Sequence, residues 1–381
     1  MKILVIEDDA AKREEIQQFI VSLGVPADNV AAAGDMAEFM AKYDAEVAIC
    51  VIDLRLPAYD GAGPERNGLG VLQAIEQAGG STKLLAISAY PGEFDDIRNQ
   101  FERRGCMLVD FEQKTVWQNI LRQMVIEGQR QEHVDFLIFC ALRAERAPYT
   151  GMIDLVGDMI FKENLTRLNM SIGGRRGIVI ELPRMGLVDA AATAGHCIEK
   201  FKPKLVAMSG ICAGFPGRAE LGQLLVSELA YEYQSGKWTA DGFSQEPYQV
   251  PISEAMRVLT REMLEDGELL TRLEHGFKLT RPAQLSEPKS ASFTSGSAVI
   301  ASEDHIKQVA IHHRRVAGLD MEIYAIHRAA HVAACRPEVL CAKTVVDLAG
   351  GDKDDRLHPY GSMISARFVV EGVQKYFEHH G

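Results

Sequence analysis

The stretch KILVI at residues 2–6, followed at once by Glu7, Asp8 and Asp9, determines how the first part of the chain is interpreted. A short apolar run that ends in polar residues is typical of a buried parallel strand. The design recurs at VAICVID (47–53), KLLAIS (83–88) and CMLVDF (106–111). Helix-type spacing accompanies these runs at Ala11–Leu23, Met36–Tyr43, Leu69–Ala78 and Gly92–Arg103. The alternation predicts an α/β domain whose parallel sheet is covered by helices on both faces.

The same alternation resumes after a polar segment, GQRQEH at 128–133, that carries no apolar period. Because 381 residues exceed what one core usually serves, we predict a domain at 1–125, a linker at 126–133 and a second domain at 134–381. Expected strands of the second domain are VDFLIFCAL (134–142), GIVIELP (177–183), LVAMSGICAG (205–214), SAVIAS (297–302) and LCAKTVVDLA (340–349), and expected helices are 189–201, 304–312 and 321–332. Residues 231–282 are irregular at first and helical from about 253, which fits either a lid or an oligomer contact.

Composition excludes several classes of protein. The net charge of −12 argues against a DNA-binding protein, since no basic surplus is present to neutralise phosphates. No apolar run approaches the roughly 18 residues that a membrane span needs, and the first residues show no signal-peptide pattern. The seven cysteines are scattered and form no CxxC pair, which is typical of reduced thiols. We therefore expect a cytoplasmic protein.

Acidic residues follow two of the strands predicted for the first domain. Glu7, Asp8 and Asp9 come after the first strand, and Asp53 ends the strand VAICVID. Reactive groups of an open parallel sheet gather at the carboxyl ends of its strands. A carboxylate cluster there needs a cation, and oxygen ligands suit Mg²⁺. Ser88 and Lys114, after the later strands, are placed to contact a phosphoryl group on a metal-held carboxylate.

This ordered set, together with Phe111, resembles the receiver domain of two-component response regulators over residues 1–125. The resemblance implies a flavodoxin-like (βα)5 fold and a cognate histidine kinase as phosphodonor. It makes Asp53 the phosphoacceptor, and it makes Asp8, Asp9 and Asp53 the Mg²⁺ ligands. Ser88, Phe111 and Lys114 become the switch residues. The sequence departs from the family in a long loop, Pro57–Gly68, and in Thr115, where proline usually follows the lysine.

Three carboxylates of the second domain stand at strand ends or helix starts. They are Glu145 in FCALRAE, Glu322 in LDMEIYA and Asp347 in KTVVD. Cleavage of a purine nucleoside requires protonation of the base, support of a cation-like ribose and activation of a nucleophile, and a carboxyl group serves each task. Each residue taken singly also fits a structural role, such as a helix N-terminus for Glu145 and Glu322 or a turn cap for Asp347.

Together, these residues make the segment 134–381 similar to the nucleoside phosphorylase superfamily, and most similar to its methylthioadenosine/S-adenosylhomocysteine nucleosidase branch. That resemblance implies an α/β fold with a mixed central sheet and assembly into dimers or hexamers. It makes Glu145 the base that activates water, Met321 and Glu322 the ribose ligands, and Asp347 the acid that protonates purine N7. It also places Gly210, in SGICAG, and Val299 and Ile300, in SGSAVI, around the substrate.

Departures from this family favour hydrolysis. Val346 replaces the usual serine beside the acid, and Val299 stands where an aromatic residue often stacks on the base. No clear counterpart exists for the arginines with which phosphorylases bind inorganic phosphate. With Glu145 retained, a hydrolase without a cofactor of its own is expected.

The substrate predicted from this combination is an adenine nucleotide. Basic residues that fit a phosphorylated 5′ end are Arg143, Arg175, Arg176, Lys353 and Arg356, with Arg146 and His358 nearby in the sequence. The fusion of a receiver to a nucleosidase is similar to the ATP-cleaving effectors of Detocs anti-phage systems, which implies a phosphorylation-regulated ATP nucleosidase. A regulated methylthioadenosine/S-adenosylhomocysteine nucleosidase, a purine nucleoside phosphorylase and a non-catalytic nucleotide sensor remain alternatives.

Overall fold

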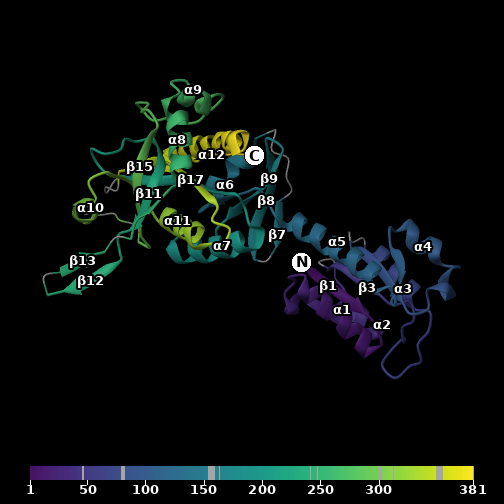
Figure 1. Cartoon of the computed structure of the whole chain (residues 1–381). Coiled ribbons are helices and arrows are strands. Elements are labelled where there is room, and N and C mark those ends of the chain that lie inside the picture. Colours follow the sequence, from purple (N-terminus) through teal and green to yellow (C-terminus); the bar gives the residue numbers. More distant parts are fainter. Residues whose placement is uncertain are drawn as a thin grey trace. The chain divides into compact units, whose positions relative to one another are not determined.

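The computed structural model divides the chain into two compact units, Met1–Glu132 and His133–Gly381, each with its own core (Figure 1). It describes residues 1–381 except 45–46, 79–81, 153–158, 163, 241, 247, 299, 301–302, 312, 349–354 and 381. No helix in this described part of the chain is long and apolar enough to cross a bilayer.

The first unit contains a five-stranded parallel sheet with the order β2-β1-β3-β4-β5. Its strands are β1 (Lys2–Ile6), β2 (Val30–Ala33), β3 (Val47–Ile52), β4 (Lys83–Ser88) and β5 (Met107–Asp110). This is the flavodoxin-like order, so the predicted fold class is confirmed for this unit. The sequence VAAA of β2 has only one β-branched residue, which explains why apolar patterning does not locate this strand.

Helices cover both faces of this sheet, as predicted. They are α1 (Ala10–Ser22), α2 (Met36–Lys42), α3 (Gly68–Gln77), α4 (Arg98–Arg103) and α5 (Lys114–Glu132), with short 3-10 turns η1 (Ala27–Asn29) and η2 (Pro91–Phe94). Ile3 and Val5 of β1 pack with Trp117 of α5 on one face, whereas Leu4 and Ile6 pack with the other core cluster. Alternate residues of a strand point to opposite faces, so each strand contributes to two cores.

Helix α5 corrects the linker prediction. Residues 128–133 were expected to be irregular, but α5 continues to Glu132. Gln, Arg and Glu, which dominate this segment, have high intrinsic helix propensity, and a helix that is already nucleated extends at little cost. The boundary between the units therefore falls directly after a helix.

The second unit is built on a ten-stranded sheet with the order β14-β11-β15-β16-β10-β6-β9-β8-β7, to which β17 is added beside β10 and β11. The strands are β6 (Phe136–Cys140), β7 (Met159–Lys162), β8 (Leu165–Ile172), β9 (Arg175–Glu181), β10 (Leu205–Gly214), β11 (Leu224–Glu232), β14 (Val250–Pro251), β15 (Lys289–Ser295), β16 (Val316–Asp320) and β17 (Glu338–Asp347). Parallel pairs such as β6 with β10 lie beside antiparallel pairs such as β8 with β9, so the predicted mixed sheet is confirmed.

One predicted strand of this unit is wrong. SAVIAS (297–302) does not form a strand in its described residues; β15 lies just before it, at Lys289–Ser295. The apolar character of the segment has another cause, because Ala298 and Ile300 line a pocket.

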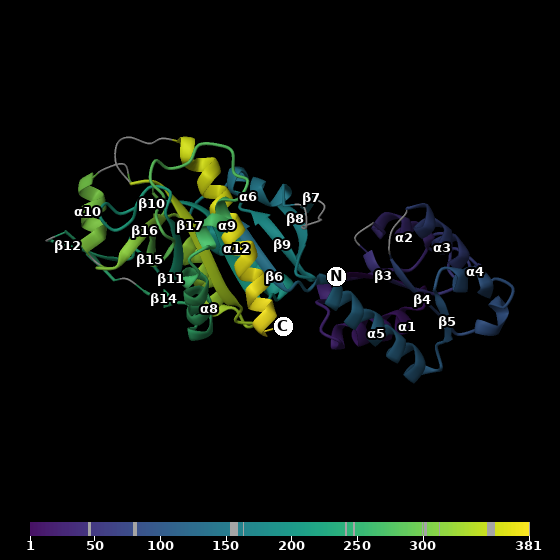
Figure 2. The same ribbon diagram turned by 90° about the horizontal axis from the view of Figure 1, so that it is seen from above.

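The helices of the second unit are α6 (Arg143–Thr150), α7 (Leu187–Phe201), α8 (Glu254–Glu265), α9 (Leu269–Glu274), α10 (Glu303–Ile311), α11 (Ile323–Val332) and α12 (His358–His380), with the turn η3 (Asp355–Leu357). Figure 2 shows α12 lying along the sheet. Met256, Met263 and Leu273 of α8 and α9 are buried in the core of the unit, so the helical half of residues 231–282 is part of the core and not a lid. The hairpin β12 (Gly236–Thr239) and β13 (Gly242–Gln245) forms a separate two-stranded sheet.

Candidate functional site

A pocket in the second unit lies where four strands end. The last residues of β6, β10, β16 and β17 line it, as do the first residues of helices α6 and α12. Glu145, Met321, Glu322 and Asp347, which are separated by up to 200 residues in the sequence, all belong to its lining. The structure thus brings together the three predicted carboxylates.

Glu145 is held firmly at the base of this pocket. Its carboxylate accepts hydrogen bonds from the backbone N–H groups of Ala141 at 2.7 Å, Leu142 at 3.0 Å and Ile211 at 2.9 Å. The side chain is buried, and burial raises the pKa of Glu145 above its usual range, opposed mainly by the positive charge of Lys343. A carboxylate with a raised pKa is a stronger base than an exposed one, which suits the activation of water.

Gly210 allows this arrangement. A Cβ at residue 210 would overlap the carboxylate of Glu145, because the backbone of β10 passes directly beside it. The predicted substrate contact of Gly210 is thus an indirect one, since the glycine makes room for Glu145.

Replacing Gly210 with alanine is expected to displace the Glu145 carboxylate and to lower the rate of base release at least tenfold, because small misplacements of a catalytic group are costly. Rates with a saturating nucleoside or nucleotide would measure the loss. The matched control is Gly195→Ala on the surface of α7, where a Cβ meets open space. Unchanged activity of Gly210→Ala would contradict this account of the glycine.

Glu322 is joined to a buried cation. Lys343 Nζ lies 2.9 Å from Glu322 Oε2 and 2.8 Å from Asp320 Oδ2, and all three side chains are nearly inaccessible. The other oxygen of Glu322 accepts from Gly186 N at 3.1 Å. Asp320 in turn accepts from the Ser295 hydroxyl at 2.6 Å and from Ile323 N at 2.9 Å. The carboxylate predicted to bind ribose is therefore fixed at both oxygens.

Lys343 and Asp320 were not predicted from the sequence. The available signal was a lysine inside the apolar strand LCAKTVVD, because a buried charge requires a partner. Lys343 is also four residues before Asp347, and residues at even spacing along a strand share a face.

The remaining predicted substrate residues divide into two groups. Ile300 and Met321 line the pocket, and Val346 lines it beside Asp347. Val299 and Lys353 lie outside the described residues. At the mouth, Asp355 and His358 also belong to the lining, with His358 Nε2 3.3 Å from Asp355 Oδ1.

Several of the arginines proposed for a 5′-phosphate lie elsewhere. Arg175 and Arg176 begin β9, which runs parallel to β6, and β9 pairs with β6 through Phe136 and Gly177. They stand at the amino end of these strands, next to Asp135, whereas the pocket lies beyond the carboxyl end. The prediction for these two residues is wrong, because a hairpin between β8 and β9 reverses the chain there.

The other basic candidates are closer to the pocket. Arg146 forms a buried ion pair with Glu181 at 2.7 Å, which gives it a structural partner. Arg143 and Arg356 are exposed, on α6 and η3 respectively. Among the described residues that line the pocket there is no arginine, and Lys343 is the one lysine.

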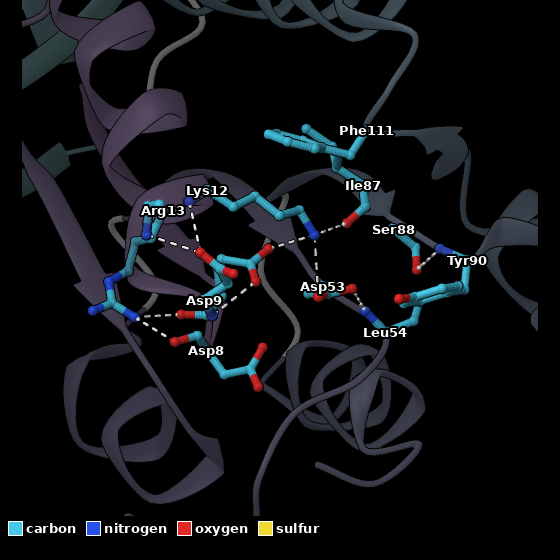
Figure 3. A network of polar contacts seen from close by, with 12 residues as sticks. Asp8, Asp9, Lys12, Arg13, Asp53, Leu54, Ile87, Ser88, Tyr90 and Phe111 are labelled. Atoms are coloured by element: carbon cyan, nitrogen blue, oxygen red, sulfur yellow. Dashed lines mark hydrogen bonds and ion pairs between the residues drawn. The ribbon is translucent and has the colours of Figure 1, made fainter.

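The first unit holds a separate carboxylate cluster. Oxygens of Glu7, Asp8 and Asp53 lie within 4.8 Å of one another, and Glu7 and Asp53 are buried. Burial raises the pKa of Glu7 to about 8, with the charge of Asp53 as the second cause. Oxygen ligands at this density fit a divalent cation such as Mg²⁺. Ser88 is buried at the end of the neighbouring strand β4, and Figure 3 shows it near Asp53.

Asp9 is not part of this cluster, contrary to the prediction. Its side chain caps α1, accepting from Ala11 N at 2.8 Å and Lys12 N at 3.0 Å. Glu7 takes the place that the prediction gave to Asp9. The reason is a shift of one residue, because the chain turns from β1 into α1 at Asp9 and directs that side chain to the helix N-terminus.

Lys114 is also displaced from its predicted place. Its ammonium pairs with Glu15 at 2.8 Å on the surface, and the residue begins α5. The cation that contacts Asp53 belongs to Lys12 of α1, at 3.1 Å (Figure 3). The aromatic ring of Phe111 lies 5.3 Å from Lys12 Nζ, measured to the ring centroid.

Comparisons with known proteins agree with the second unit. The model of the phosphorylase superfamily matches residues 162–367. Protein y4jS of Sinorhizobium fredii is 28% identical over 98% of this chain and 99% of its own. The ATP nucleosidase Cap17 of Escherichia coli is 24% identical over 55% of this chain, and the match spans only 43% of Cap17.

Solved structures show the same fold. The S-adenosylhomocysteine nucleosidase of Streptococcus pyogenes superposes with a TM-score of 0.52 at 17% identity, covering 64% of this chain and 97% of its own. The methylthioadenosine/S-adenosylhomocysteine nucleosidase of Neisseria meningitidis gives 0.51 at 17% identity, covering 63% and 98%. The futalosine hydrolase of Helicobacter pylori gives 0.50 at 15% identity, covering 63% and 97%. The predicted nucleoside-phosphorylase-like fold is confirmed.

Proposed function

The chain belongs to the phosphorylase superfamily, and from this membership we propose that it hydrolyses the N-glycosidic bond of ATP or a related adenine nucleotide. The observation that carries the proposal is the gathering of Glu145, Glu322 and Asp347 in one pocket. A pure nucleotide sensor has no need of three carboxylates around one ligand.

Each carboxylate has a task in this reaction. Glu145 takes a proton from water, and the water oxygen bonds to C1′ of the ribose as the C1′–N9 bond breaks. Asp347 gives a proton to N7, so that the base leaves as neutral adenine. Glu322, fixed by Lys343 and Gly186, holds the ribose hydroxyls while positive charge develops on the ring. General acid and base residues on the two sides of a glycosidic bond act in the same way on sugars.

Hydrolysis is favoured over phosphorolysis by the charges of the pocket. Inorganic phosphate needs cationic ligands, typically arginines. No arginine lines the described part of the pocket, and its single lysine is occupied by Asp320 and Glu322. Water, activated by Glu145, requires no such ligands.

A nucleotide substrate is supported by the relation to Cap17, whose name is ATP nucleosidase. Incubation with ATP, AMP, adenosine and methylthioadenosine, followed by chromatography for free adenine, tests the choice. Release of adenine from ATP or AMP with ribose phosphate as the second product is the expected result. If no base is released from any nucleotide, the proposal is wrong.

A thio-nucleoside is the second candidate, and one observation favours it. Beside Lys343 and His358, the described lining carries Glu145, Asp320, Glu322, Asp347 and Asp355, an acidic set that disfavours a polyanion. If methylthioadenosine releases adenine and ATP does not, the protein is a regulated methylthioadenosine/S-adenosylhomocysteine nucleosidase.

For the first unit we propose a receiver domain that controls this activity, since an enzyme that destroys nucleotides must stay inactive until it is triggered. Asp53 Oδ attacks the phosphorus of a phosphohistidine on a histidine kinase, the P–N bond breaks, and an acyl phosphate forms on Asp53. Mg²⁺, held by Glu7, Asp8 and Asp53, offsets the charge of the transferred group. The reaction thus places a dianion in a buried carboxylate cluster.

A further inference from the structure

Lys12 is the cation that contacts the carboxylate cluster of the first unit. Its ammonium lies 2.6 Å from Glu7 Oε2, 3.1 Å from Asp53 Oδ2 and 3.1 Å from the carbonyl oxygen of Ile87. Only 8% of the Lys12 side chain is exposed. Three acceptors from three separate strands, β1, β3 and β4, therefore fix one ammonium group beside the phosphoacceptor candidate.

Lys114 is not placed for this role. It follows β5 by four residues, its side chain is 53% exposed, and both oxygens of Glu15 accept from its ammonium. The residue directly after β5 is Phe111, an aromatic side chain that carries no charge. The end of β5 thus gives the cluster no ammonium group among the described residues.

We propose that Lys12, from helix α1, is the phosphoryl-binding cation of this unit, a role that sequence patterning assigns to Lys114. The inference rests on the proposed phosphorylation of Asp53. A phosphoryl group on Asp53 adds between one and two negative charges and three acceptor oxygens. An ammonium 3.1 Å from Asp53 Oδ2 needs only a small shift to donate to one of these oxygens.

Phosphoryl binding by Lys12 has a readable consequence. When its ammonium turns toward the phosphoryl oxygens, its bond to Glu7 weakens and its position over the Phe111 ring changes. Phe111 stacks on Trp117 with ring centroids 6.1 Å apart, and the Trp117 indole donates to the Phe111 carbonyl at 3.1 Å. Trp117 therefore reports on the state of Lys12.

The test uses the full chain carrying Trp238→Phe, which leaves Trp117 as its one tryptophan; Trp238 is largely exposed, on β12 of the second unit. Beryllium fluoride with Mg²⁺ serves as the probe, and the fluorescence of Trp117 is titrated. In parallel, a small acyl phosphate is the phosphodonor: Asp53 attacks its phosphorus, its P–O bond breaks, its acid leaves as a carboxylate, and mass spectrometry measures phosphoryl incorporation.

The variants are Lys12→Met and the matched control Lys114→Met. We expect Lys12→Met to weaken beryllium fluoride binding by about tenfold or more, the loss of one charge-assisted hydrogen bond, and Lys114→Met to change it less than about threefold. Lys12→Arg keeps the charge if Lys12→Met does not fold, and it is expected to retain most of the binding. Circular dichroism verifies folding in each case.

The outcomes separate the inference from the proposal on which it rests. If the unsubstituted protein neither binds beryllium fluoride nor takes up a phosphoryl group, phosphorylation of Asp53 is wrong and the inference falls with it. If it does both, and Lys114→Met loses binding while Lys12→Met retains it, the assignment of Lys12 alone is overturned. Equal binding by all variants overturns it as well.

Discussion

Asp347→Asn is expected to reduce the rate of adenine release about a thousandfold, within the range that general acid catalysis usually contributes. Asn has the shape of Asp but no proton to give to N7, so the base would have to leave as an anion. The measurement is single-turnover release of adenine at saturating substrate, and the dissociation constant of the substrate should change little.

The matched control for this variant is Asp355→Asn. Asp355 lines the mouth of the same pocket, and its side chain is largely exposed beside His358. We expect its effect on the rate to stay below tenfold. An Asp347→Asn protein that retains a tenth of the original rate would show that another group protonates the base.

Lys343→Met is expected to destabilise the second unit by roughly 3–5 kcal/mol, the usual cost of removing one partner from a buried ionic group. Asp320 and Glu322, each nearly inaccessible, would lose the cation that lies within 2.9 Å of both. The desolvated carboxylates would then either take up protons or open the pocket to water. Chemical denaturation followed by circular dichroism measures the change in unfolding free energy.

Two control variants make this prediction specific. Lys343→Arg keeps the charge and is expected to recover part of the stability. Lys289→Met removes a half-buried lysine whose ammonium donates to the backbone carbonyl of Arg218, and its cost should be about 1 kcal/mol. If Lys343→Met unfolded at the same denaturant concentration as the unsubstituted protein, the ionic group would not contribute to stability.

Sequence patterning located most of the sheet but not the exact position of side chains at its ends. The apolar runs at 2–6, 47–53 and 205–214 became β1, β3 and β10, because buried parallel strands need continuous apolar sequence. At the end of β1, however, Asp9 was expected at the metal and Glu7 is there instead. Successive side chains alternate in direction, so an error of one residue exchanges a ligand for a helix cap.

Long-range pairing explains the other differences. Glu145, Glu322 and Asp347 were found because each stands at a strand end or helix start, which is where sites of α/β sheets form. Lys343 and Lys12 were missed because each is fixed by acceptors on other strands, and spacing along the chain carries no record of them. Arg175 and Arg176 were misplaced because their distance from the pocket depends on the direction of β9.

The uninterrupted course of α5 determines what kind of signal can pass along the chain. At 1.5 Å per residue, the 19 residues of this helix extend about 28 Å, from Lys114 at the edge of the first unit to Glu132. A flexible tether transmits only proximity, whereas a hydrogen-bonded helix transmits torque. A rotation started at Trp117 would therefore arrive at residue 132 with its direction preserved. Regulation in this chain then depends on helical phase, so that adding one residue to α5 would turn the signal by about 100° without changing either unit.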